Sequence, residues 1–245
     1  MSEWWRLALG CAVLLAAAVG VGRHHQLGVG RTQLIAALRA VAQLALVALA
    51  LRGVFAAPVT VVAVVAAMFS VAVWTSARRL RDLDGAPRAV TVGVALGAAF
   101  TIVVVVGVPT LDRDVRTLVA VSGIVIGGAM TASTLAGRHL REGFHRRRDE
   151  IEAWLSIGAT PREACRDVVR SAAAEALVPG LDQTRTVGLV TLPGAFVGAL
   201  LGGASAVGAA RFQIVVLIGL LCTQVVTATT VTHLLGAPAT LPAGA

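Results

Sequence analysis

Val90–Val108 reads VTVGVALGAAFTIVVVVGV, an apolar run without a single charged residue. One helix of this length can cross a bilayer, because a spanning helix needs about 20 predominantly apolar residues. Charged residues, Pro or Gly bound six further apolar segments: Leu7–Val21, Leu34–Leu51, Val59–Trp74, Thr117–Leu135, Val187–Leu201 and Phe212–Leu235. We therefore predict an all-α integral membrane protein, a polytopic helical bundle of about seven transmembrane helices. Residues 1–245 would form a single transmembrane domain.

The composition supports a bilayer rather than water as the solvent. The 245-residue chain is 57% hydrophobic and only 14% charged, and its mean hydropathy is +0.83. A soluble domain carries about 25% charged residues. Folding this chain in water would leave too few charges to cover its surface.

The basic residues exclude two classes of site. All 21 are Arg, so the chain lacks the Lys of a nucleotide-binding P-loop and cannot form a Lys Schiff base. Cys11, Cys165 and Cys222 are widely spaced, without a zinc-type cluster or a disulfide framework. We expect no catalytic residue, no metal site and no cofactor bound by this chain.

The distribution of Arg predicts the orientation in the membrane. Most Arg residues fall in the first, third and fifth loops, whereas the N-terminus and the even-numbered loops hold Arg6, Arg52, Arg113, Arg116 and Arg211. Basic loops stay in the cytoplasm, so we place the N-terminus outside and the C-terminus inside a plasma (bacterial inner) membrane. We interpret the first segment as a retained span rather than a signal peptide, because Trp4 and Trp5 suit a membrane interface. Topology and anionic lipid account for the net charge of +8 without nucleic acid.

Small residues four apart predict close helix contacts. Gly93 and Gly97, Gly123 and Gly127, and the series 194, 198 and 202 each place Gly on one helix face. Such faces let the backbones of neighbouring membrane helices approach each other.

The stretch 137–186 is the only extended polar region, and we interpret it as a cytoplasmic loop of two helices. Ile151, Trp154 and Leu155 have the spacing of a short amphipathic helix, and Gly158 suits its end. Thr160, Pro161 and Glu163 have the pattern of a capping box that opens a second helix, which we expect to end near Pro179 and Gly180. An exposed Trp154 on such a protruding helix would be an anchor for a docking partner.

The sequence Glu152-Ala153-Trp154, followed by Gly158, resembles the first half of the coupling loop of ABC transporter permeases, with Trp in place of the second Ala. A wider ordered set resembles the FetB-type ABC permease family, which includes bacterial iron-export and plant aluminium-tolerance permeases. The set comprises 128–132 (GAMTA), 155–161 (LSIGATP), 176–182 (ALVPGLD), 186–194 (TVGLVTLPG) and 210–215 (ARFQIV), and the resemblance extends over about 31–231.

The resemblance implies a permease subunit that exports iron or a related metal species. It implies a separate ABC ATPase subunit that carries ATP and magnesium, and a second permease copy in a homodimer. The ATPase-coupling residues would be Glu152, Ala153, Trp154, Gly158, Thr160 and Pro161.

Polar residues within or beside the predicted spans are candidates for a transport pathway, because such groups are costly in lipid. They are Arg39, Gln43, Met130, Asp182, Gln183, Arg185, Pro193 and Gln213. Each has a structural alternative: Arg39 could reach the headgroups, Met130 could simply pack, and Asp182 with Arg185 could form a local pair. Pro193 and Gly194 would kink the sixth span.

Two other classes of function stay open. A secondary transporter driven by an ion gradient would need intramembrane carboxylates, and none of the seven segments contains Asp or Glu. A membrane enzyme or scaffold is the other alternative, but no arrangement of catalytic residues supports the enzyme.

Overall fold

The computed structural model describes residues 2–54, 58–108, 111, 114–238 and 240–241. These residues form helices and no strand, as expected of an all-α membrane protein, and they divide into two compact units, 1–60 and 61–245. In the part of the chain that the structure describes, six helices are long and apolar enough to cross a membrane: Glu3–His24, Gly30–Leu49, Thr60–Arg79, Ala86–Gly107, Val115–Arg146 and Ala206–Leu235.

The first unit is a helical hairpin of α1 (Ser2–His24) and α2 (Gly30–Val54). The turn between them contains Gln26 and Gly28, both with positive φ. Close to the turn, Gly22 lies near Val29, and Gly30 lies near Val19. Small residues therefore let the two helices meet beside the turn.

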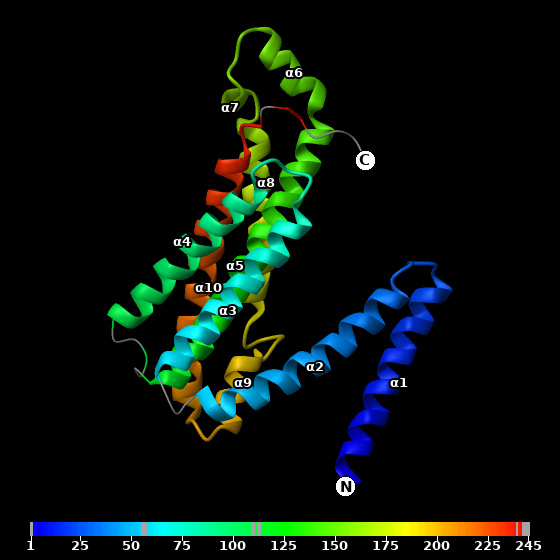
Figure 1. The fold of residues 1–245 in the computed structure, drawn as a ribbon, viewed down its shortest axis with the longest axis vertical. Helices are drawn as coiled ribbons and strands as arrows, with labels where there is room; N and C mark the ends of the chain where they lie inside the picture. Colours follow the sequence, from blue (N-terminus) through cyan, green and yellow to red (C-terminus); the bar gives the residue numbers. More distant parts are fainter. Residues whose placement is uncertain (1, 55–57, 109–110, 112–113, 239, 242–245) are drawn as a thin grey trace. The chain divides into compact units, whose positions relative to one another are not determined.

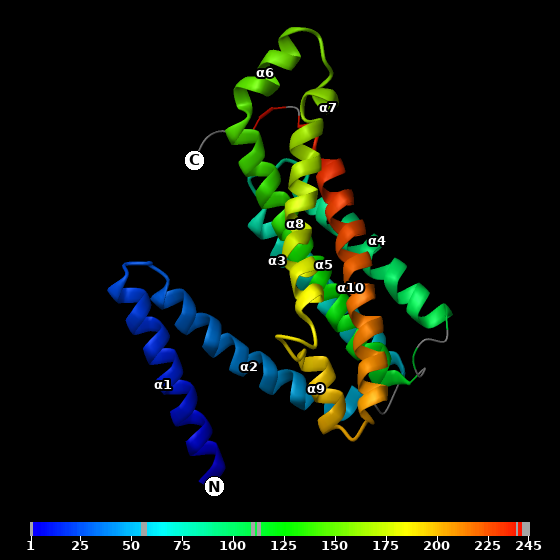
Figure 2. The same cartoon turned by 180° about the vertical axis from the view of Figure 1, so that it is seen from behind.

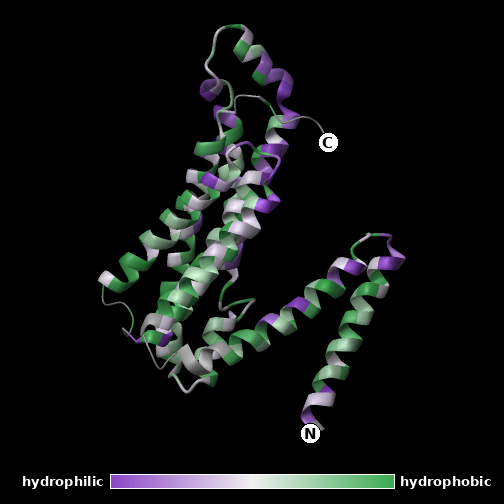
Figure 3. Cartoon of the chain, in the orientation of Figure 1, coloured by the Kyte–Doolittle hydropathy of each residue, from purple (hydrophilic) through white to green (hydrophobic). Residues whose placement is uncertain are grey.

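The second unit contains the remaining helices (Figure 1). They are α3 (Pro58–Arg79), α4 (Ala86–Gly107), α5 (Val115–Arg146), α6 (Arg148–Ser156), α7 (Pro161–Ala164), α8 (Arg166–Thr186), α9 (Gly194–Leu201) and α10 (Ala206–Leu235). The last helix, α10, packs against α4, α5 and α8. Figure 3 shows that hydrophilic residues gather at the end of this unit that carries α6 and α7.

Gly93 and Gly97 make the contact between α4 and α10 as predicted. A Cβ atom at Gly97 would overlap the hydroxyl of Thr227 and lie 2.8 Å from the Thr223 carbonyl oxygen. The Thr227 hydroxyl donates to the Gly93 carbonyl at 3.1 Å. Small residues thus bring the backbones together, and a hydroxyl joins the two helices inside an apolar bundle.

The other two Gly ladders differ from the prediction. Gly123 contacts Met68 of α3, but nothing lies within 4 Å of a Cβ at Gly127, Gly194 or Gly198. The packed position on α5 is Gly128, which receives Leu220 of α10. Four-residue spacing selects a helix face, but it cannot say whether a neighbour covers that face.

The predicted sixth span, 187–201, is not a continuous helix. The chain turns at 187–193, where Gly188 has φ +80 and Val187 pairs with Thr191 in an isolated bridge. Pro193 then caps α9, which has only eight residues. The turn forms because Gly188 adopts a left-handed conformation and because Pro193 lacks the N–H that would continue a helix.

The second predicted loop helix is longer than expected and does not end at Pro179. A short α7 precedes a break at Cys165, and α8 then continues through Pro179 to Thr186. Two hydroxyls of α8 bond to carbonyls four residues earlier, Thr184 to Gly180 at 2.8 Å and Thr186 to Asp182 at 3.0 Å. Since α8 packs on α5 and α10, much of 137–186 belongs to the bundle and not to a hanging loop.

Candidate functional site: the α6–α7 loop and the polar face of α8

The α6–α7 loop is built as the sequence predicts. The α6 helix ends at Ser156, and Gly158 reverses the chain with φ +94 while its N–H donates to Leu155. Thr160 caps α7 in a full capping box with Glu163, and Pro161 occupies the first turn. Backbone geometry therefore fixes the loop on both sides of the turn.

Hydrogen bonds of the capping box lower the pKa of Glu163. Both the hydroxyl and the backbone N–H of Thr160 donate to its carboxylate, at 2.7 Å and 2.9 Å. These bonds favour the charged form, so the pKa lies below the ordinary Glu value. The box is therefore formed by the carboxylate at neutral pH.

The inner side of the loop packs firmly on the bundle. Ile151, Cys165 and Val168 are buried in the same cluster as Phe144 and Leu140 of α5. Burial raises the pKa of the Cys165 thiol, which packs as a small apolar group. The loop and the helices beneath it therefore share one core.

Ion pairs surround the start of α6, and one of them reaches the start of α8. The Arg147 guanidinium bonds to Glu150 with two contacts of 2.7 Å and 2.8 Å, and it lies 4.0 Å from Asp167. Arg148 pairs with Glu152 at 2.8 Å. The contact of Arg147 with Asp167 could not be predicted from the sequence, because Asp167 lies on a different helix.

The outer side of the loop leaves apolar side chains uncovered. Trp154 is 49% exposed and Ile157 is 75% exposed, and Leu155 is exposed as well. Trp154, Ile157 and Gly158 line a hollow of about 530 Å³ that Arg147 and Glu163 also border. The amphipathic helix predicted at 151–155 is confirmed, with Ile151 buried and its two apolar companions exposed.

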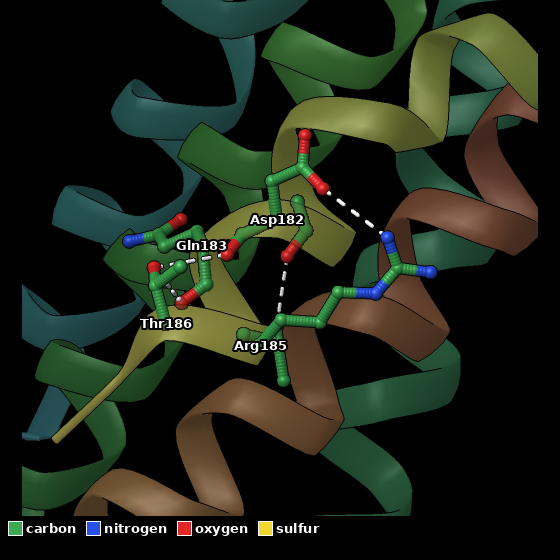
Figure 4. A network of polar contacts seen from close by, with 6 residues as sticks. Asp182, Gln183, Arg185 and Thr186 are labelled. Atoms are coloured by element: carbon green, nitrogen blue, oxygen red, sulfur yellow. Dashed lines mark hydrogen bonds and ion pairs between the residues drawn. The ribbon is translucent and has the colours of Figure 1, made fainter. Parts of the chain in front are cut away.

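The predicted ion pair between Asp182 and Arg185 is present near the end of α8. Figure 4 shows Arg185 reaching back toward Asp182 while Gln183 points away from both. The Arg185 to Asp182 distance is 3.3 Å, and the two side chains are 72% and 60% exposed. The pair therefore stabilises one turn of α8 without being covered by the described chain.

Most of the other predicted pathway residues lie on other elements. Arg39 and Gln43 are exposed on α2, Pro193 caps α9, and Met130 lies on α5. The Met130 carbonyl accepts from Ser76, Ser133 and Thr134, while its side chain packs in the bundle. Within the described residues, Asp182 and Arg185 make the one side-chain hydrogen bond that joins two members of the predicted set.

Two buried amides stand out in α10. Gln213 is 6% exposed, and the side-chain oxygens of both Gln213 and Gln224 are buried without a partner among the described residues. Gln224 lies directly against Gly180 of α8, whose missing side chain leaves room for the amide. The sequence suggests Gln213 as a pathway residue, but only the fold brings Gln224 and Gly180 together.

The described residues contain no group of three His, Cys, Asp or Glu side chains that could hold a metal ion. Arg113, one of the cations counted for the orientation, lies outside the described residues, and nothing is described of the Arg52 side chain.

Comparisons with known proteins identify the family of the chain. Residues 4–238 match the uncharacterised protein family UPF0014. The chain is 32% identical to the UPF0014 membrane protein STAR2 of Oryza sativa subsp. japonica, over 83% of this chain and 72% of the relative. It is 28% identical to the probable iron export permease protein FetB of Escherichia coli, over 86% and 82%.

A further relative is the protein ALUMINUM SENSITIVE 3 of Arabidopsis thaliana, 32% identical over 68% of this chain and 61% of the relative. No solved structure matches the chain. The family match covers nearly all of the sequence, including the α6–α7 loop and both parts of the broken passage. This membrane protein therefore belongs to the UPF0014 family.

Proposed function

We propose that this chain is the membrane subunit of an ABC-type exporter and that a separate ATPase subunit docks on the α6–α7 loop. The observation that carries the proposal is the two-sided loop. Its outer side exposes Trp154, Leu155 and Ile157, and its inner side is buried against α5 and α8. An exposed aromatic anchor suits a docking contact, and a buried base can pass its displacement on to the helices.

Iron or a related metal species is the proposed substrate, and a second permease copy is the proposed assembly partner. The name of the Escherichia coli relative, a probable iron export permease, supports the substrate. ATP and magnesium would bind to the ATPase, since this chain contains no Lys for a P-loop. The proposed orientation places α6 and α7 in the cytoplasm, where basic loops remain.

Replacing Trp154 by Ala tests the docking role of the loop. We expect Trp154→Ala to leave the chain in the membrane but to reduce both ATPase association and metal export by about tenfold or more, because anchor residues dominate such contacts. Gly158→Pro should act similarly, since Pro cannot adopt the φ of +94 found there.

Trp74→Ala is the matched control for Trp154→Ala. Trp74 is also an exposed Trp, but it lies on α3, where it packs against Arg78. Its replacement should leave the ATPase bound and export unchanged. Full export by both loop variants would contradict the docking role.

A secondary transporter driven by an ion gradient is the second candidate, and one observation favours it. The α8 helix, which packs along α10, carries Glu175 and Asp182. The predicted spans contain no Asp or Glu, but α8 brings these two carboxylates into the bundle through its packing against α5 and α10. Metal export by the purified chain in vesicles without an ATPase would support this candidate over the first.

A further inference from the structure

One face of α8 carries a line of charged side chains. Glu175, Asp182 and Arg185 are all exposed, and Val178 is exposed between Glu175 and Asp182. The opposite face buries Val168, Ala172 and Ala176 against the bundle. We call the exposed residues 175, 178, 182 and 185 the α8 stripe.

Contacts with α10 define the depth of the α8 stripe. Val169 meets Gly236, and Gly180 meets Gln224, so the two helices run antiparallel with a constant offset. The same offset places Asp182 level with Cys222. Figure 2 shows α8 beside α10 and ending part-way along it.

Cys222 lies at the centre of the apolar part of α10. Between Arg211 and His233, α10 contains no charged side chain, and Cys222 is the midpoint of that interval. Asp182 therefore lies near the bilayer centre, and Arg185 follows about 4.5 Å further along the helix at 1.5 Å per residue.

Lipid cannot cover a face of this kind. A charged side chain at the bilayer centre costs several kcal/mol and normally faces protein or water. The turn that follows α8 has the same requirement: among the described hydrogen bonds, none reaches the carbonyl oxygens of Gly188, Leu189 or Val190. Irregular backbone at this depth occurs only against protein or a water-filled space.

We propose that a second copy of this chain covers the α8 stripe, with Arg185 of each copy reaching Asp182 of the other. The α8 stripe carries carboxylates at Glu175 and Asp182 and a cation at Arg185, so a second stripe can offer a carboxylate to Arg185 and a cation to Asp182. A two-fold axis along the membrane normal would place both stripes at the same depth and exchange the roles of Asp182 and Arg185. The pair within one chain uses one Arg185 nitrogen at 3.3 Å, which leaves further N–H donors of the guanidinium for the second copy.

This inference deepens the proposed pairing of two permease copies and is independent of the ATPase. The contact between two α8 stripes can be tested in membranes that contain no ATPase. Docking of an ATPase on the α6–α7 loop could be observed whether or not the α8 stripes meet.

Cysteine cross-linking in native membranes tests the proposal on the full chain. Cys11, Cys165 and Cys222 are replaced by Ala, and Val178→Cys is introduced within the α8 stripe without altering its charges. Oxidation should give a covalent dimer on a non-reducing gel. Leu96→Cys is the control, because Leu96 is exposed on α4. Its neighbour Gly97 contacts Thr223 and Thr227 of α10, which places Leu96 at about the depth of Val178.

Charge reversal then tests the pairing itself. Asp182→Arg in the Val178→Cys background should lower the yield of dimer by about tenfold, and the double variant Asp182→Arg/Arg185→Asp should restore it. Two results would overturn the proposal: no dimer from Val178→Cys although a permeant maleimide labels it, or equal dimer from Leu96→Cys. Equal yields from the single and double charge variants would overturn the Asp182 to Arg185 contact.

Discussion

At the scale of single residues, the bundle depends on places where no side chain fits. Gly97 is the clearest case, because a methyl group there would meet the Thr227 hydroxyl and the Thr223 carbonyl of α10. Thr101 adds hydroxyl bonds one turn further along, to Thr223 at 2.7 Å and to the Gly219 carbonyl at 3.3 Å. These contacts join two helices that apolar lipid would not drive together.

Gly97→Ala should therefore destabilise the protein in detergent by roughly 1–3 kcal/mol, the usual cost of overpacking. Gly127→Ala is the matched control, because nothing lies within 4 Å of its Cβ and Ala is the better helix former by about 1 kcal/mol. Thermal unfolding of both variants measures the difference. Equal melting temperatures would show that α4 and α10 are not packed through Gly97.

The capping box makes a prediction about pH. The folded-state pKa of Glu163 is lowered, because Thr160 donates to its carboxylate. Its stabilising contribution is therefore complete above the ordinary Glu pKa and is lost as the pH falls through the lowered value. Protection of the Thr160 amide against hydrogen exchange, relative to Glu163→Gln at each pH, should stay constant down to that range. Loss of protection already near neutral pH would contradict the assignment.

At the scale of elements, the sequence predicted what short-range chemistry determines. The capping box at Thr160 and the end of α6 at Gly158 depend on neighbours a few residues away, and both are present. The spacing of Gly93 and Gly97 is also local, but the helix that packs on them, α10, is distant in the sequence. Composition and the length of the apolar segments indicated a membrane protein made of helices.

The failures concern packing between distant segments. Local rules place a helix end at Pro179, but α8 continues because it is held between α5 and α10. Hydropathy placed a span at 187–201, where the structure has a turn and a short helix. Asp167, the more distant ion-pair partner of Arg147, and Gly180, which lies against Gln224, are on other helices, so no local pattern in the sequence indicates these two contacts.

The turn at 187–193 gives a prediction for this broken passage. Leu189 and Val190 are 90% and 79% exposed. Backbone carbonyl groups without a hydrogen bond at this depth need protein or water beside them. If the turn borders a water-filled pathway, a small water-soluble thiol reagent should label Val190→Cys in membranes. Val103→Cys is the control, because it is exposed on the outer face of α4 at a similar depth and should face lipid.

If Val190→Cys and Val103→Cys react equally slowly with the reagent, the turn does not border a water-filled pathway. Faster reaction of Val190→Cys during export than at rest would additionally connect the turn with transport. Broken helices are used in this way in transporters, where the ends of half-helices face the substrate.

At the scale of the whole molecule, the second unit is polarised. One end carries the α6–α7 loop, with exposed apolar groups and Arg-based ion pairs, and the middle carries the α8 stripe. Since α8 begins in the loop core and ends at the turn, it connects the two regions through one continuous helix. This connection is the physical basis for proposing that energy enters at the loop and acts within the membrane.

The most direct test of the central claim is to isolate the tagged chain from its native membranes in mild detergent and to identify the proteins bound to it. We predict a stoichiometric subunit with a P-loop Lys and ATPase activity, present with the unaltered chain and lost with Trp154→Ala. Isolation of the chain without an ATPase, even after cross-linking in the membrane, would contradict the claim.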